Sequence, residues 1–262
     1  MLSKKYVIVF DLDETLGHFS QAFRFWDLLK IYLNNNNLHE NNLFKLFDLF
    51  PEFFRTDIFK LLKLIKYKKQ KKICDKVMIY TNNCGPNNWV SLIKDYIHKK
   101  INYNLFDQII RAFKINGKHI ELCRTSYNKT HRDFINCTKL PENTEICFID
   151  DNYHHKMQHE NVLYINVKPY YNIFDYKFMC KKYYNNNKNL FKTHYNEFEN
   201  FIINNTYYDD YTKLYVEKST VEKNIEFLIT QKMIKEIKLF LSQNKKYTRK
   251  HKLYNNNKTR KN

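Results

Sequence analysis

Short apolar runs alternate with amphipathic stretches over the first two thirds of the chain. Four runs have the length and composition of buried strands: YVIVF (6–10), KVMIY (76–80), EICFI (145–149) and VLYINV (162–167). Three stretches carry apolar residues every three or four positions, as helices packed on one side do: 19–33, 56–69 and 88–100. Strands that alternate with helices predict an α/β fold with a parallel sheet and right-handed crossovers.

The spacing of these elements also predicts how the chain is divided. The segment 17–72 is too long for a plain crossover, so we expect a helical insert there. Beyond about residue 180 the pattern weakens, until an amphipathic helix follows at 220–241, opened by a Ser219 or Thr220 cap. The expected parts are one domain over 1–180, a helical extension over 181–243 and a basic, disordered tail over 244–262.

The net charge of +18 has two interpretations. Clustered Lys and Arg favour a polyanionic partner such as a nucleic acid, through the surface or the tail. The same charge follows from an A+T-rich genome, such as that of a large DNA virus or a protist, which also accounts for 21 Phe and 21 Tyr beside 3 Gly and 4 Pro. The charge alone therefore does not establish nucleic-acid binding.

Cysteine usage and the lack of long apolar segments indicate the compartment. Six cysteines fall at irregular spacings without a CxxC pair, so we expect reduced thiols rather than a disulfide or zinc framework. The apolar run near the N-terminus is too short for a signal peptide, and no segment approaches the length of a membrane span. We expect a soluble intracellular protein, cytoplasmic or nuclear, with no membrane partner.

Polar residues of a particular kind follow three of the expected strands. Asp11 and Asp13 follow the first, Thr81 follows the second, and Asp150 and Asp151 follow the third. The carboxyl ends of parallel strands meet at one edge of a sheet, so these side chains should converge. Clustered carboxylates repel one another unless protons or a cation intervene, and an oxygen-only cluster suits Mg²⁺, which commonly binds substrate phosphate as well. The sequence thus predicts a magnesium site built for a phosphate.

The order of these motifs resembles that of a known enzyme superfamily. DLDETLGH (11–18), YTNN (80–83), a lysine before a helix, and FIDDN (148–152) are similar to the four motifs of the haloacid dehalogenase phosphotransferases. DLDETLGH is most similar to the DLDETLVH of protein-serine phosphatases that act on the RNA polymerase II C-terminal domain, the NLI-interacting-factor-like family; only Gly17 departs. The resemblance covers about 5–168 and implies a haloacid dehalogenase-like Rossmannoid sheet flanked by helices.

The resemblance implies a role for each acidic residue. Asp11 resembles the nucleophile that forms an aspartyl-phosphate, and Asp13 resembles the general acid and base. The expected metal ligands are Asp11, Asp13, Asp150 and Asp151.

The remaining motif residues would bind the substrate phosphate. Thr81 resembles the hydroxyl donor of the second motif, and Asn82 would add an amide. Lys129 resembles the third-motif lysine that neutralises the phosphoryl group; Lys118 and Arg132 are alternatives.

Two departures from the family's pattern affect the expected substrate more than the expected chemistry. The family normally has Arg-Pro before the helix that leads to the second motif, whereas Arg55 is followed by Thr56. The segment after the first motif looks helical, whereas the family has a small stranded insert that helps to choose the phosphopeptide. A zinc site at His154, His155 and His159 is not expected, because their spacing fits no standard pattern.

The leading hypothesis is a Mg²⁺-dependent phosphatase acting on phosphoserine or phosphothreonine of a protein. One alternative is a nucleic-acid 3′-end phosphatase, which the positive charge would favour. Another is a basic nucleic-acid-binding or scaffold protein that keeps the fold without turnover.

Overall fold

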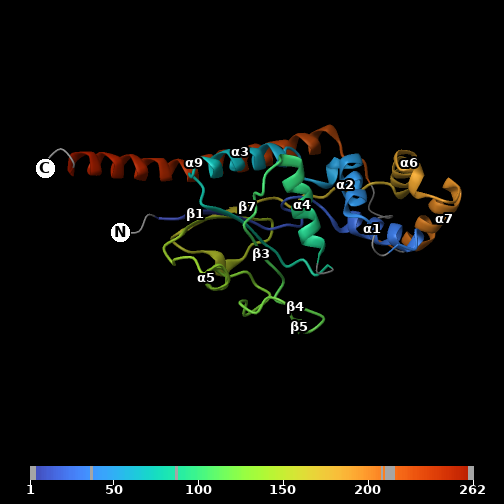
Figure 1. The fold of residues 1–262 in the computed structure, drawn as a ribbon, viewed down its shortest axis with the longest axis horizontal. Helices are drawn as coiled ribbons and strands as arrows, with labels where there is room; N and C mark the ends of the chain where they lie inside the picture. Colours follow the sequence, from blue (N-terminus) through green and yellow to red (C-terminus); the bar gives the residue numbers. More distant parts are fainter. Residues whose placement is uncertain (1–3, 36–37, 86–87, 208, 210–215, 259–262) are drawn as a thin grey trace.

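Five parallel strands form the central sheet of the computed structural model (Figure 1). Their order across the sheet is β3 (Gln108–Ile110), β2 (Lys76–Tyr80), β1 (Tyr6–Phe10), β6 (Glu145–Asp150) and β7 (Val162–Asn166). Each neighbouring pair is parallel. The α/β class and the parallel sheet are therefore confirmed, and all four predicted strands are present.

The structure describes residues 4–35, 38–85, 88–207, 209 and 216–258, with the backbone alone from residue 244 onward. Within these ranges, no helix combines the length and the apolar character that crossing a bilayer requires.

Helices cover both faces of the sheet, which explains why its strands are apolar throughout. On one face, Val7 and Val9 pack with Phe134 of α5 (His131–Thr138). On the other face, Ile8 and Phe10 belong to a larger core. That core is closed by α3 (Ile58–Gln70), α4 (Trp89–Ile101) and α9 (Thr220–Lys258). Alternate residues of β1 thus serve opposite layers, as the period of a strand requires.

The predicted helical insert follows β1, beyond the carboxyl edge of the sheet (Figure 1). It consists of α1 (Ser20–Tyr32), α2 (Glu40–Leu49) and the 3-10 helix η1 (Pro51–Phe53). Two later helices, α6 (Tyr176–Asn186) and α7 (Tyr195–Thr206), pack against α2 and α1. The insert and the C-terminal third share one hydrophobic core, and the expected boundary at residue 180 falls inside α6.

The smaller elements are a two-stranded hairpin and two 3-10 turns. They are β4 (Lys114–Ile115), β5 (Lys118–His119), η2 (His155–Met157) and η3 (Lys188–Leu190). The hairpin is antiparallel and lies apart from the main sheet.

Helix α9 begins as the sequence predicts. The Ser219 hydroxyl accepts a hydrogen bond from the Glu222 backbone N–H (3.2 Å), and the Glu222 carboxylate accepts one from the Ser219 N–H (2.8 Å). The inner face of α9 packs into the main core through Met233, Ile237 and Phe240. The sequence predicts a disordered tail over 244–262, whereas the backbone continues as helix α9 to Lys258; residues 259–262 lie outside the described set.

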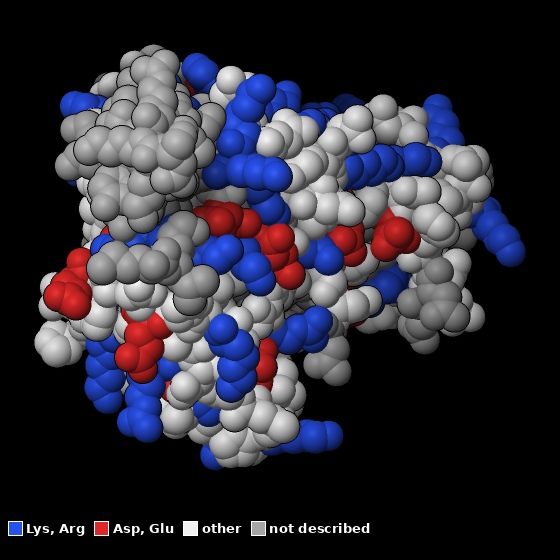
Figure 2. Space-filling view, turned by 60° about the vertical axis from the view of Figure 1, so that its left-hand side comes forward, with Lys and Arg blue, Asp and Glu red and all other residues white. Residues whose placement is uncertain are grey.

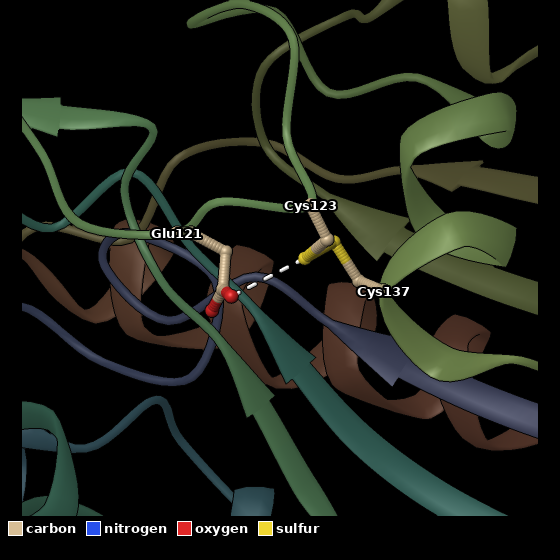
Figure 3. Close-up of side chains that lie close together, drawn as sticks. All are labelled: Glu121, Cys123 and Cys137. Atoms are coloured by element: carbon tan, nitrogen blue, oxygen red, sulfur yellow. Dashed lines mark hydrogen bonds between the residues drawn. A yellow bond between two sulfur atoms is a disulfide. The ribbon is translucent and has the colours of Figure 1, made fainter.

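The expectation that all cysteines are reduced is wrong for one pair. Cys123 and Cys137 form a disulfide, with Cα atoms 5.0 Å apart, and Glu121 lies beside them (Figure 3). Cys123 lies in the loop before α5 and Cys137 in the last turn of α5, so the pairing depends on how this loop folds back along the helix. Irregular spacing in the sequence does not reveal such a contact. The other four cysteines are free, and three of them are buried.

Candidate active site

The site lies where the strand order reverses. From β1 the chain builds β2 and β3 on one side of the sheet, then crosses to β6 and β7 on the other side. Asp11 directly follows β1, Asp150 ends β6, and the Asp11 N–H donates to the Ile149 carbonyl (2.9 Å). Such a switch point opens a crevice at the carboxyl ends of two adjacent strands, which is where open α/β sheets bind ligands.

Three carboxylates meet at this crevice around one ammonium group. Oxygen atoms of Asp11, Asp150 and Asp151 lie within 4.8 Å of one another. The Lys129 Nζ donates to Asp11 Oδ1 and to Asp150 Oδ2, the latter at 2.7 Å, and the lysine is only 2% exposed. Lys129 therefore reaches the cluster, whereas Lys118 lies exposed in β5.

A helix cap orients the segment that carries Lys129. The Thr130 hydroxyl accepts from the Asp133 backbone N–H (2.9 Å) at the start of α5, so the chain turns immediately after the lysine. Arg132, the other alternative, lies one turn further on in α5 and lines a different cavity.

The electrostatics of the cluster favour a bound cation. Burial raises the pKa of Asp150 and of Asp151, and the nearby charge of Asp11 raises both further. Burial by itself would lower the pKa of Lys129, but Asp11 and Asp150 hold it above its ordinary value. One ammonium cannot neutralise three carboxylates, and an oxygen-only donor set of this kind fits Mg²⁺.

The histidines near the cluster are weaker candidates for metal ligands than the carboxylates. His154 lies closest, with Nε2 3.5 Å from Asp150 Oδ2; burial, helped by the charge of Lys129, lowers its pKa to about 4. The imidazole is therefore neutral at physiological pH. His159 instead stacks on His131, with ring centroids 3.9 Å apart. Within the described residues, the groups of side chains that could hold a metal ion include none of His154, His155 and His159.

Asp13 points toward a different partner. Its Oδ2 accepts a hydrogen bond from the Asn83 amide (2.7 Å), and the group of three carboxylates does not include it. Burial raises the pKa of Asp13 to about 7, while the Asn83 hydrogen bond opposes the rise and the charge of Asp11 adds to it. The predicted acid-base position is thus near the cluster, but the side chain is not among the carboxylates grouped there.

The turn after Asp13 leaves no room for a side chain at Gly17. The Glu14 backbone is left-handed (φ 55°), and its N–H donates to the Gly17 carbonyl (2.7 Å). A Cβ at Gly17 would lie 2.3 Å from the Phe53 carbonyl oxygen, so no larger residue fits without movement of the insert. Thr15 faces the cluster: its hydroxyl accepts from the Asp151 N–H (3.0 Å) and donates to Asp151 Oδ1 (3.1 Å).

The loop after β2 brings Thr81, Asn82 and Asn83 to the cleft. The Thr81 hydroxyl accepts from the Asn83 N–H (3.0 Å), and the buried Arg124 donates to the Thr81 carbonyl (3.1 Å). Asn83, which contacts Asp13, was not predicted. The second asparagine of YTNN was the available signal, but the sequence alone does not tell which of two adjacent amides turns inward.

These groups line an open cleft of about 490 Å³. Its lining residues are Asp11, Asp13, Glu14, Thr81, Asn82, Asn83, Asn128, Lys129, Asn152, Tyr153 and His154. Glu14 was also missed; burial, followed by the charge of Asp13, raises its pKa to about 8. The cleft thus combines an acidic floor and a buried ammonium with walls rich in amides.

No protein-family model, curated protein or solved structure matches the chain. What the cleft can do chemically follows from its own groups. It offers a carboxylate held by a lysine, a second carboxyl that keeps its proton close to neutral pH, and amide and hydroxyl groups for polar contacts.

Proposed function

We propose that the protein is a Mg²⁺-dependent phosphatase of the haloacid dehalogenase type, acting on phosphoserine or phosphothreonine of a protein. One observation supports this best. Asp11, Thr81, Lys129 and Asp150 come from four separate segments, in the chain order of that superfamily's motifs. The first three line one cleft, and the buried Asp150 forms an ion pair with Lys129. Chance placement of acidic residues after strands would not also bring a buried lysine into contact with two of them.

In this mechanism Asp11 is the nucleophile. An oxygen of its carboxylate forms a bond to phosphorus as the bond from phosphorus to the ester oxygen breaks, which leaves an aspartyl-phosphate. Lys129, held against Asp11 and Asp150, stabilises the negative charge of the phosphoryl group during transfer. The Thr81 hydroxyl and the Asn82 amide supply polar contacts for the phosphate oxygens.

Asp13 serves as the acid and then as the base. With a pKa of about 7 it holds a proton near neutral pH, which it gives to the leaving alcohol oxygen. It then takes a proton from the water that attacks phosphorus, and the bond to Asp11 breaks to release inorganic phosphate. Asn83 orients the Asp13 carboxyl throughout.

Asp11, Asp150 and Asp151 would hold the metal. When bound, Mg²⁺ would neutralise part of the negative charge of these carboxylates and of the phosphoryl group. Thr15, bonded to Asp151 in both directions, fixes the orientation of that ligand.

The first test is hydrolysis of p-nitrophenyl phosphate with Mg²⁺ or with EDTA. We expect Mg²⁺-dependent turnover that Asp11→Asn lowers on the order of 10³-fold or more, because the variant has no nucleophile. Asp95→Asn, at a half-exposed aspartate on α4, is the matched control and should retain full activity. Activity retained by Asp11→Asn would remove the mechanism.

The net charge favours a second substrate class, the 3′-phosphorylated end of a nucleic acid. Figure 2 shows Lys and Arg side chains spread across one face of the molecule, with Asp and Glu between them. Comparing kcat/KM for a phosphoserine peptide with that for a 3′-phosphorylated oligonucleotide of equal length decides between the two. If the oligonucleotide has the higher kcat/KM, the nucleic-acid end replaces the phosphoprotein as the proposed substrate.

A further inference from the structure

A buried arginine lies directly behind the turn that follows Asp13. Arg55 is 1% exposed, and three of its side-chain hydrogen bonds go to main-chain carbonyls. Its Nε donates to the Thr15 carbonyl (2.7 Å), and its Nη2 donates to those of Glu14 (2.6 Å) and Lys168 (2.8 Å). The planar guanidinium thus joins the turn after β1 to the segment that follows β7.

This turn connects Arg55 to the reacting groups on two sides. Glu14 directly follows Asp13, and its left-handed backbone is held in place through its own carbonyl. Thr15, whose carbonyl also accepts from Arg55, bonds Asp151 through its hydroxyl. A shift of the guanidinium would therefore move Asp13 and loosen the support of Asp151.

The carboxylate that faces Arg55 comes from the C-terminal helix. Glu226 of α9 is 7% exposed, and its Oε2 lies 3.5 Å from Arg55 Nη1. Among the described residues, neither of these two atoms has a hydrogen-bond partner, so the pair interacts as buried charges. The contact is anchored close by, because the Thr230 hydroxyl of α9 donates to the Thr56 carbonyl (2.7 Å).

We propose that Arg55 is a positioning residue for Asp13, and that Glu226 keeps it in place, so that α9 forms part of the active site's support. The proposal rests on the phosphatase function proposed above. Removing the Glu226 charge leaves a buried guanidinium with carbonyl and ring contacts but without its carboxylate partner, and the guanidinium then gains by turning toward solvent. The Glu14 and Thr15 carbonyls lose their donor, and Asp13 no longer lies in line with the leaving oxygen.

The test compares two leaving groups in wild type, Glu226→Gln and Arg55→Lys. Phenyl phosphate needs a proton from Asp13 far more than p-nitrophenyl phosphate does, because phenolate is the poorer leaving group. We expect kcat/KM for phenyl phosphate, which reports the formation of the aspartyl-phosphate, to fall about tenfold or more in both variants, since a small misplacement of a catalytic group is costly. We expect kcat/KM for p-nitrophenyl phosphate to fall about threefold at most. Lysine keeps the charge of Arg55 but not its fork of donors.

The ratio of the two kcat/KM values separates positioning from folding. A variant that merely unfolds in part loses the same fraction of activity on both substrates, so an unchanged ratio overturns this inference. Glu217→Gln is the matched control, because Glu217 is a largely exposed glutamate just before α9, and it should leave both rates unchanged. A wild-type protein that hydrolyses neither substrate overturns the proposed function itself, whereas an active wild type with unchanged ratios in the variants overturns only the role of Arg55 and Glu226.

Discussion

Asp13 illustrates how a single carboxyl links chemistry to stability. Its pKa rises from an ordinary 3.8 to about 7, because burial disfavours the charged form and Asp11 is close. Between these two values the folded protein binds a proton that the unfolded chain has released. Stability therefore decreases as the pH rises from about 4 to about 7, and above that range the folded state carries the full cost of the buried charge.

Asp13→Asn should therefore stabilise the metal-free protein, and more so at pH 8 than at pH 5. We expect a gain of roughly 1 to 2 kcal/mol at pH 8, less than the full shift implies because the carboxyl is partly exposed. Urea unfolding in EDTA at both pH values measures the difference, with Asp95→Asn as the control. An equal effect at the two pH values would show that the Asp13 charge is not the cause.

At the scale of residues, the sequence predicts the groups that define strand ends better than those that support them. Asp11, Thr81 and Asp150 follow directly from apolar runs of fixed length, so their convergence needs only the rule for parallel sheets. Arg55 was noticed only because Thr56 replaces a proline. Its role depends on Glu226, a residue far away in sequence that the packing of α9 brings to it.

At the scale of elements, the length and burial of each helix or strand determine whether the sequence predicts it. Strands β1 and β2 coincide with their predicted runs because four or five apolar residues stand together. Strand β3 was missed because it is a three-residue edge strand, half-buried over two of its positions. A helical extension was expected over 181–243, but α6 and α7 were not located individually. Polar residues and tyrosines interrupt their sequences, and their burial comes from α1 and α2 rather than from an obvious apolar stripe.

The disulfide links two elements that present Lys129. It joins Cys123, before the lysine, to Cys137 in the last turn of α5, so Lys129 lies inside the closed loop. Closing a loop of about 15 residues restricts the unfolded chain by about 3 kcal/mol. We expect Cys137→Ser to lower the unfolding free energy by about that amount in the absence of reductant.

Thermal unfolding with and without dithiothreitol provides the check. Reductant should lower the Tm of wild type toward that of Cys137→Ser and leave the variant unchanged. Cys84→Ser, at the exposed free cysteine, is the control and should respond as wild type does. A wild-type Tm that reductant does not alter would contradict a stabilising link.

At the scale of the whole molecule, the C-terminal third is part of the fold rather than an appendage. Phe240 of α9 packs edge-on against Tyr6 of β1, with ring centroids 5.5 Å apart, and Phe198 of α7 packs against Phe25 of α1 (6.3 Å). The first strand and the insert therefore complete their burial only after residues beyond 180 have been added. A fragment ending at the last motif would expose this apolar surface.

The sequence beyond residue 243 differs from the packed part of the C-terminal third, because it is positively charged and has no apolar periodicity. Residues 244–262 contain eight Lys or Arg and no Asp or Glu, so their removal lowers the net charge from +18 to +10 (18 − 8). If the tail binds nucleic acid, truncation should weaken the binding of a single-stranded oligonucleotide and make log Kd less steep in log salt, because fewer counterions are released. Turnover of p-nitrophenyl phosphate should stay unchanged, since α9 keeps its packed part. Fluorescence anisotropy across a salt series measures the effect, with Asp11→Asn as a full-length control that still binds. Equal salt slopes for the full-length and truncated proteins would show that the tail does not bind nucleic acid. Its charge would then reflect the composition of the chain instead of a partner.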